Sequence, residues 1–403
     1  MRRVVITGLG VVSALGTNAA GNWDSLAAAR SGIAPITLFP NDALTAKVAA
    51  EVKGYNTLDH FPEKQSAFMD RFAQFAVVAA REAVGHSGIA FDGQLKSRTA
   101  VVVGSGVGGI TTLDENFERL YKNGLRVHPF CIPRFMANAG ASHVSMALGI
   151  TGPSFTVASA CASANHALGV ALQMLRAGAV DVALSGGSEA TITFGTMKGW
   201  EALRVMAPDA CRPFSAGRRG MVLGEGAGIF VLETLEHAKA RGAAILAELM
   251  AVGMSSDAGD LTLPNLEGPT AAMRAALAEA AMAPEAIDYI NAHGTGTIAN
   301  DATETKAIHA VFGGHARAVP VSSTKSAHGH GLGAAGAIEL AATLLAMKHG
   351  VVPATLNYVE PDPACDLNLV VNQPREARID AAMSNSFAFG GLNAVVIVRR
   401  FAG

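Results

Sequence analysis

Cys161 lies where a β-rich segment meets a helical pattern. The stretch FTVASACASANHALGVAL is rich in β-branched residues before Ala160 and, from Ser163 onward, has apolar residues at the spacing of one helix face. A thiol at this junction lies near a helix N-terminus, where free N–H groups and the helix dipole stabilise a thiolate and lower its pKa. The same N–H groups can bind the oxyanion of a thioester under attack. This setting favours a nucleophile, and the alternative is a small packing residue.

Three histidines and a lysine lie on two glycine-rich loops. His293 follows a strand-like DYIN in NAHGTGT, and Lys325, His328 and His330 lie in SSTKSAHGHGLGAAGAIE, before a helix. Taken singly, each histidine is more readily explained as a surface or hydrogen-bonded residue than as a catalyst. The spacing of His328 and His330 is also that of metal ligands, and with His293 they could form a zinc site. No acidic residue stands close enough in sequence to supply HExxH-like chemistry.

Two further glycine motifs have to be weighed. Residues 104–109, GSGVGG, match GxGxxG after a strand, but the ribose-binding acid expected about 20 residues later is missing. No GxxxxGK[ST] follows any strand, so we exclude nucleotide binding. In SNSFAFGGLNA, residues 384–394, a turn between two strands lets backbone N–H groups approach a ligand closely, although an ordinary β-hairpin has the same pattern.

Short β-branched runs alternate with alanine-rich helical patterns, which predicts an α/β fold. The predicted strands are Arg3–Thr7, Thr99–Val103, Phe155–Ala158, Val180–Ser185, Gly228–Leu232, Ile245–Val252, Ile287–Asn291, Val319–Ser322, Met383–Ser386 and Ala394–Val398. The predicted helices are Arg71–His86, Ser163–Ala177, Pro269–Ala281 and Ala334–Lys348. The second half loosely repeats the first, so we expect an internal duplication with halves 1–245 and 246–403, fused in one body.

Composition excludes several classes of protein. The net charge of the 403 residues is −2, so no global basic field recruits nucleic acid or an anionic membrane. The chain has no run of 18 apolar residues, which predicts no membrane span. We interpret the opening MRRVVITGLGVVSALG as a strand and turn rather than a signal peptide. The four widely spaced cysteines are then expected to be reduced thiols in the cytoplasm.

In order along the chain, these motifs resemble the β-ketoacyl-acyl carrier protein synthases of classes I and II, the condensing enzymes of fatty-acid synthesis. The likeness runs from VVITGLGVVSALG to NSFAFGGLNA. It implies a thiolase fold, with two βαβαβαββ halves in a five-layer α/β/α/β/α sandwich, and a homodimer. It also implies a catalytic triad of Cys161, His293 and His330, supported by Lys325 and Glu339.

The resemblance implies roles for further residues. Phe389 matches a gating phenylalanine, whose N–H would share the oxyanion hole with that of Cys161. Thr262, Thr295 and Thr297 match the channel for the phosphopantetheine arm of acyl carrier protein, so no tightly bound cofactor is expected. The implied acyl pocket is formed by Val107, Cys131, Trp200 and Phe387, and the implied carrier-protein surface by Lys64, Arg126 and Arg204.

The chain departs from a typical class II synthase at several positions. Ala388 replaces a flexible glycine in the gate, and Leu392 replaces a threonine. The stretches VHPFCIPRFMANAG and TMKGWEALRVMAPDACRPFS are more similar to the nodulation-protein E type, which favours a specialised acyl chain. One rival, a non-condensing, chain-length-factor-like partner subunit, lacks the nucleophile that Cys161 provides. A degradative thiolase would need a second cysteine in the last glycine loop, and 384–393 contains none.

Overall fold

Each of the ten predicted strands is present in the computed structural model, which describes residues 2–402. These strands form one sheet. In chain order they are β1 (Val4–Ser13), β4 (Thr99–Gly104), β5 (Ser154–Val157), β6 (Val182–Glu189), β7 (Gly226–Thr234), β8 (Ala247–Ser256), β9 (Tyr289–Asn291), β10 (Val321–Ser322), β13 (Ala381–Ala388) and β14 (Leu392–Arg399).

The four predicted helices are also present, as α3 (Arg71–Ser87), α7 (Ser163–Arg176), α10 (Glu267–Ala280) and α13 (Ala335–His349). The helices that the sequence patterns did not predict are α1 (Ala19–Ala27), α2 (Glu63–Ser66), α4 (Ile110–Asn123), α5 (Cys131–Phe135), α6 (Ala139–Leu148), α8 (Phe194–Ala202), α9 (Leu235–Ala240), α11 (Ile298–Phe312) and α12 (Lys325–His328). Two short strand pairs lie outside the main sheet: β2 (Ala34–Pro35) with β3 (Val48–Ala49), and β11 (Val351–Val352) with β12 (Arg375–Glu376).

The strand order confirms the internal duplication. Across the sheet it is β10-β9-β13-β14-β8-β1-β7-β6-β4-β5. The two halves meet where β1 pairs with β8 in antiparallel fashion, through Val5 opposite Glu248 and Ile6 opposite Ala247. Outward from this join the spatial order is β1-β7-β6-β4-β5 in one half and β8-β14-β13-β9-β10 in the other. If the strands are numbered within each half in chain order, both halves read first, fifth, fourth, second, third. The predicted boundary between residues 245 and 246 stays a prediction.

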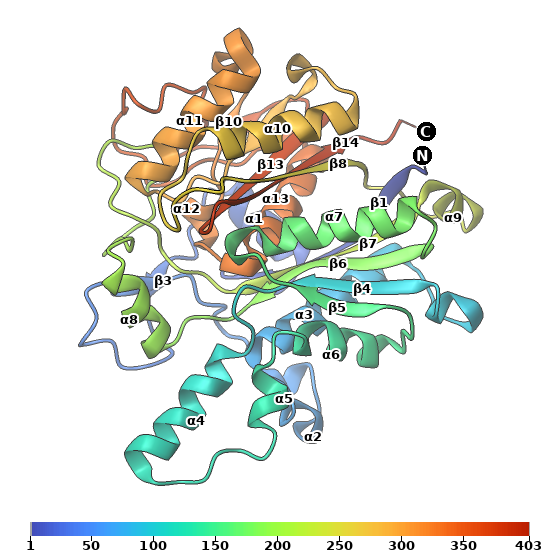
Figure 1. Ribbon diagram of the computed structural model, residues 1–403, viewed down its shortest axis with the longest axis vertical. Helices are drawn as coiled ribbons and strands as arrows, with labels where there is room; N and C mark the ends of the chain where they lie inside the picture. Colours follow the sequence, from blue (N-terminus) through green and yellow to red (C-terminus); the bar gives the residue numbers. More distant parts are fainter. Residues whose placement is uncertain (1, 403) are drawn as a thin grey trace.

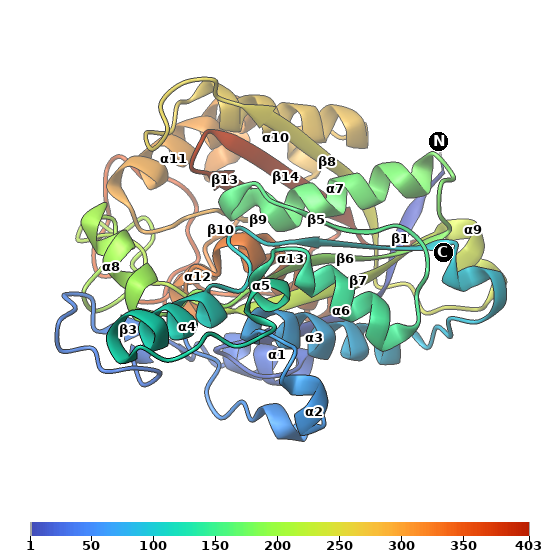
Figure 2. The same ribbon diagram turned by 60° about the horizontal axis from the view of Figure 1, so that its bottom comes forward.

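The helices cover the sheet in layers (Figures 1 and 2). On the outer face of the N-terminal half lie α3 and α6, and on that of the C-terminal half lie α10 and α11. Between the halves α7 and α13 pack against strands of both. This gives the five-layer sandwich of the thiolase fold.

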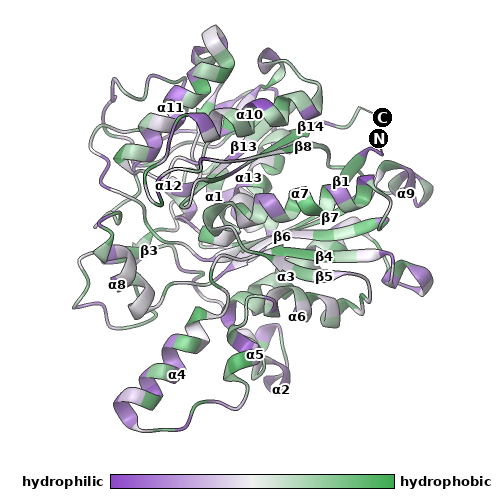
Figure 3. Cartoon of the chain, viewed as in Figure 1, coloured by the Kyte–Doolittle hydropathy of each residue, from purple (hydrophilic) through white to green (hydrophobic). Residues whose placement is uncertain are grey.

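The middle layer is apolar because it has no solvent face. Every residue of α13 from Ala335 to Met347 is buried, and the largest core cluster joins α13 and α7 to strands of both halves. In Figure 3 the strands of the main sheet are largely hydrophobic, whereas α4, at the periphery, is mixed. Within residues 2–402 no helix combines the length and the apolar character that crossing a bilayer requires.

Candidate active site

One cavity of about 280 Å³ collects residues that are far apart in the chain. Nine of the residues predicted for the site line it: Cys161, Trp200, Thr262, His293, Thr295, Thr297, His330, Phe387 and Phe389. Much of the remaining wall is apolar, with Leu203, Val205, Met221, Leu261, Leu263 and Pro264. The fold therefore brings the predicted nucleophile, both predicted histidines and the predicted channel threonines to a single space.

Cys161 lies on the sharp turn between β5 and α7. Ala160 has a φ of +48°, in the left-handed region that few non-glycine residues adopt. The turn is held by Ser163, whose Oγ donates to the carbonyl of Ala160 (2.7 Å) and accepts from the N–H of Ser159 (2.9 Å). Gly104, at the end of β4, lets α7 begin this close, because a side chain there would collide with the backbone of Ser163.

The resting thiol is buried and protonated. Burial raises the pKa of Cys161 to about 11, although the charge of Lys325 and the backbone N–H groups of Phe389 and Cys161 lower it. The predicted net lowering of this pKa is therefore wrong: backbone N–H groups do lower it, but the loss of water around the sulfur outweighs them. The same contacts place the N–H groups of Phe389 and Cys161 beside the sulfur, where an oxyanion hole needs them.

His293 is fixed by a carboxylate and a lysine. Its own N–H and that of Gly294 each donate to Glu304 (2.8 Å both), which projects from α11. The Nζ of Lys325 donates to the His293 carbonyl (2.6 Å) and lies 3.3 Å from its Nδ1. Since an ammonium only donates, Nδ1 accepts and Nε2 carries the ring proton. Burial, with the positive charge of Lys325, holds the pKa of His293 well below 6.5, so the ring is a neutral donor.

His330 is held in the same tautomer by its own loop. The N–H of Leu332 donates to His330 Nδ1 (3.2 Å), which leaves the proton on Nε2. Its backbone is tied to the segment before β7, because its N–H donates to the carbonyl of Val222 (2.7 Å). Burial and Lys325 again hold its pKa well below 6.5. The ring centroids of His293 and His330 are 5.4 Å apart, so two neutral N–H donors can serve one oxygen.

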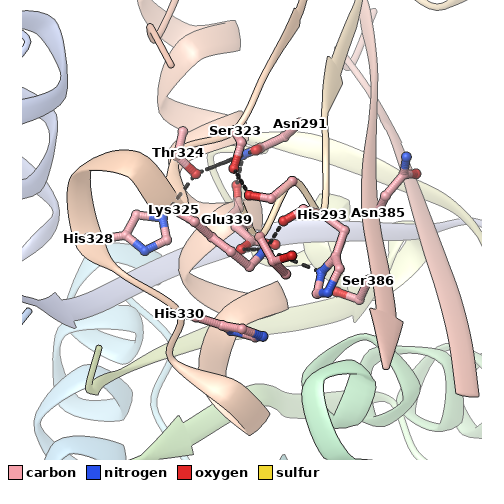
Figure 4. Close-up of polar contacts among 12 residues, drawn as sticks. Asn291, His293, Ser323, Thr324, Lys325, His328, His330, Glu339, Asn385 and Ser386 are labelled. Atoms are coloured by element: carbon pink, nitrogen blue, oxygen red, sulfur yellow. Dashed lines mark hydrogen bonds and ion pairs between the residues drawn. The ribbon is translucent and has the colours of Figure 1, made fainter. Parts of the chain in front are cut away.

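Lys325 and Glu339 form a buried ion pair behind His293 (Figure 4). Neither side chain is exposed. Burial raises the pKa of Glu339 to about 7, while Lys325 lowers it. Neither residue lines the cavity, so the pair acts on the site through the charge of Lys325 and its contacts with His293.

His328 points away from the site (Figure 4). Its Nδ1 lies 2.8 Å from the Gly329 carbonyl and its Nε2 lies 2.9 Å from Thr324 Oγ1, so both ring nitrogens are occupied. The three-histidine zinc arrangement does not form. Among residues 2–402 no cluster of three or more His, Cys, Asp or Glu side chains is placed to hold a metal ion.

Phe389 closes the cavity on the side of α8. Its ring lies 5.8 Å from that of Trp200, and the next residue, Gly390, donates from its N–H to the Leu261 carbonyl (2.8 Å). Just before it, Ala388 is buried and pairs with Leu392 across the hairpin. The two residues that depart from the typical class II pattern are thus direct neighbours at the base of the predicted gate.

Other predicted residues lie outside the cavity. Val107 is 45% exposed on the loop after β4, and Cys131 is buried at the start of α5. Lys64 on α2 and Arg126 after α4 are exposed, as is Arg204, which lies between the cavity residues Leu203 and Val205. Their predicted roles in the acyl pocket and in carrier binding stay predictions.

Glu304 is a further residue of the site that the sequence motifs did not predict. It holds two backbone N–H groups of the NAHGTGT loop and accepts from Asn385 Nδ2 (3.1 Å) on β13. Burial raises its pKa. The available signal was an acidic residue in NDATETKA at helical spacing from apolar Ala307 and Ile308, which pack into the core.

A cysteine beside two neutral histidines, deep in a duplicated five-layer fold, is the arrangement of enzymes that condense acyl thioesters. The chain belongs to the β-ketoacyl synthase family: the family's N-terminal domain matches residues 1–238 and its C-terminal domain residues 246–359. It is accordingly an acyltransferase of the 3-oxoacyl-[acyl-carrier-protein] synthase type.

Individual relatives agree over the full length. The chain is 50% identical to nodulation protein E of Rhizobium leguminosarum bv. trifolii and 41% identical to 3-oxoacyl-[acyl-carrier-protein] synthase 2 of Staphylococcus aureus strain N315, covering 99% of both chains in each comparison. A solved structure, the ishigamide ketosynthase/chain length factor, superposes with a TM-score of 0.95 at 38% identity over 100% of both chains. A second, a type II ketosynthase solved with its acyl-carrier protein (AntDE:AntF), gives 0.90 at 30% identity, again over 100% of both chains.

Proposed function

We propose that Cys161 is the nucleophile of a decarboxylative Claisen condensation between an acyl thioester and malonyl-acyl carrier protein. Its sulfur attacks the acyl carbonyl, the bond to the carrier sulfur breaks, and the thiol proton ends on the departing carrier thiol. The N–H groups of Phe389 and Cys161 stabilise the oxyanion of this step. The observation that supports the assignment is the convergence of a buried thiol and two neutral N–H donors in one cavity.

In the second half-reaction, malonyl-carrier loses carbon dioxide as its C–C bond breaks. The electron pair passes into an enolate, whose oxygen accepts from the Nε2–H groups of His293 and His330. The enolate carbon then attacks the acyl-Cys161 carbonyl, the C–S bond breaks, and the leaving thiolate takes up a proton from solvent. The product is a β-ketoacyl-carrier, two carbons longer than the acyl group.

The substrates are carried on phosphopantetheine, so the enzyme needs no tightly bound cofactor of its own. Thr262, Thr295 and Thr297 line the cavity and offer hydroxyl groups to the amides of such an arm. The basic residues Lys64, Arg126 and Arg204 would contact the acidic carrier protein. The four cysteines are free and buried, which supports a reducing compartment, the cytoplasm.

We assign the enzyme to a specialised acyl chain. The higher identity to nodulation protein E than to synthase 2 supports this, as do Ala388 and Leu392 at the gate. A role as a non-condensing partner subunit is disfavoured because the thiol and both histidine donors are retained. The decisive assay incubates the protein with acyl- and malonyl-carrier and identifies the product by mass spectrometry. If no β-ketoacyl-carrier forms in this assay, the proposal is refuted.

A homodimer completes the proposal. β5 is the last strand of the sheet, so one of its edges is unpaired, and Phe155 on it is exposed. Further exposed apolar side chains lie on α4, α5 and the adjoining segments: Phe117, Leu120, Tyr121, Phe130, Ile132 and Met136. A second copy pairing at β5 would cover both. Light scattering should give about twice the 41.3 kDa monomer mass. A monomeric mass for the protein alone, with a dimer formed only after a second synthase-like subunit is added, would contradict the homodimer and support a heterodimer.

A further inference from the structure

The glycine loop that imitates a nucleotide-binding motif is an anion-binding nest filled by the protein's own carboxylate. Glu189, the last residue of β6, is fully buried beneath residues 104–109. Its Oε2 accepts from the N–H of Gly106 (2.6 Å), and its Oε1 accepts from Ser105 Oγ (2.9 Å) and, at 3.3 Å, from the N–H groups of Val107 and Gly108. Convergent backbone N–H groups of this kind bind anions.

The same carboxylate also reaches the loop of His330. The N–H of Gly333 donates to Glu189 Oε2 (3.0 Å), and a Cβ on Gly333 would lie only 2.5 Å from that oxygen. Its neighbour Leu332, which fixes the His330 tautomer through its N–H, has a φ of +45°. A non-glycine residue persists in this conformation only where its surroundings hold it. The anchor on the adjacent residue is Glu189.

The turn before Cys161 packs against Gly106, whose N–H also donates to Glu189. A Cβ on Gly106 would lie 3.6 Å from both Cα and O of Ala160, the left-handed residue before Cys161. The turns Ala160–Ala162 and Leu332–Ala334 are in direct contact. One carboxylate therefore bonds Gly333, the neighbour of strained Leu332, and Gly106, which packs against strained Ala160. Leu332 fixes a histidine, and Ala160 directly precedes the nucleophile.

Burying this charge without a cation is costly, so it requires compensation. Burial raises the pKa of Glu189 to about 7, and the factors that lower it are the hydrogen bonds from Gly106, Ser105, Gly333 and Val107. Glu189 touches neither the cavity nor the proposed reacting atoms.

We propose that Glu189 is a positioning residue that sets the geometry of Cys161 relative to His330 by joining the 104–109 loop to Gly333. This inference rests on the roles proposed above for Cys161 and His330. Joining the two loops requires one acceptor oxygen at the right reach, Oε2, which accepts from both Gly106 and Gly333, and no proton transfer. The turnover of Glu189→Gln, which keeps the side-chain length, should therefore differ from that of Glu189→Asp, which is too short.

Three variants test this. Glu189→Gln keeps the length and one carbonyl oxygen for Gly106 and Gly333, so kcat for carbon dioxide release from malonyl-carrier should stay within about tenfold of wild type. Glu189→Asp keeps the charge but is one methylene too short to join both loops, and Glu189→Ala removes the anchor. For these two we expect a loss in kcat of about 10²-fold, the cost of a misplacement of about 1 Å, with KM changed less than threefold.

A spectroscopic readout separates positioning from general damage. The ¹⁵N shifts of the His330 ring, assigned by their loss in His330→Gln, should report the Nε2–H tautomer in wild type and Glu189→Gln, and a tautomer mixture in Glu189→Asp. The matched control is Glu233→Gln: Glu233 is a fully buried carboxylate on β7 bonded to Thr7, His237 and Arg241. It should lower Tm while leaving kcat and the tautomer unchanged.

The outcomes are distinct. A Gln variant as inactive as Asp, a wild-type kcat in Asp or Ala, or an unchanged His330 tautomer in Asp would each overturn the proposal. If Glu189→Ala fails to fold, a higher kcat for Glu189→Gln than for Glu189→Asp still supports the proposal, and the reverse order overturns it. A wild-type protein that releases no carbon dioxide would instead contradict the proposed function, and the tautomer measurement would still test Glu189.

Discussion

Removing either histidine donor should strongly slow decarboxylation without preventing acylation. His293 and His330 are neutral and present Nε2–H groups, because each Nδ1 accepts from a fixed donor, Lys325 or the Leu332 N–H. His293→Ala and His330→Ala each delete one hydrogen bond to the developing enolate oxygen. The loss of one oxyanion donor costs about 10²–10³-fold in kcat, or about 2.7–4 kcal/mol.

The assay is carbon dioxide release from malonyl-carrier in a Cys161→Ala background, so that acyl transfer does not contribute. Because both donors serve one oxygen, the double variant should lose less than the product of the two single losses. His328→Ala is the matched control, since both of its ring nitrogens bond to protein groups away from the cavity. It should lose stability and keep turnover within a few-fold. A larger loss for His328→Ala than for His330→Ala would refute this account of the loop.

Three further outcomes are expected. Alkylation of Cys161, followed by peptide mass mapping, should accelerate about tenfold per pH unit from pH 7 to 9, because its pKa of about 11 keeps the thiolate scarce; a plateau near pH 8 would contradict this. Trp200→Phe should shift the acyl-length profile towards longer chains, because the indole lines the cavity. Val107→Ile and Cys131→Phe should shift the profile towards shorter chains, because each enlarges a side chain predicted to form the pocket wall. A profile unchanged in all three variants would refute the pocket assignment. Ala388→Gly should lower the free energy of unfolding by about 0.5–1 kcal/mol, measured by chemical denaturation, and speed gate opening, seen as faster acylation of Cys161.

The sequence predicted the sheet well because its strands are short apolar runs bounded by glycine and polar residues. It missed α11 because that helix buries Asp301, Glu304 and Thr305 along with apolar residues, so its pattern lacks a clean polar face. α4 was missed for a different reason: it lies at the periphery, and only Thr112 and Asn116 of its side chains are buried.

At the site, local motifs identified the groups that line the cavity but not those behind them. Glu189 lies in LSGGSEAT, far in sequence from both loops that it joins, and only the fold reveals those contacts. The pKa of Cys161 was predicted in the wrong direction for the same reason. The helix N-terminus can be seen in sequence, whereas the exclusion of water by residues from other segments cannot.

The most direct test of the central claim is the intact mass of the protein after exposure to an acyl-carrier. The wild-type chain should gain one acyl group, which tryptic mapping places on Cys161 and which disappears when malonyl-carrier is added, as β-ketoacyl-carrier forms. Cys161→Ala should gain none while keeping the wild-type circular dichroism spectrum. An acyl adduct that persists on folded Cys161→Ala, or one that malonyl-carrier never discharges, would contradict the account.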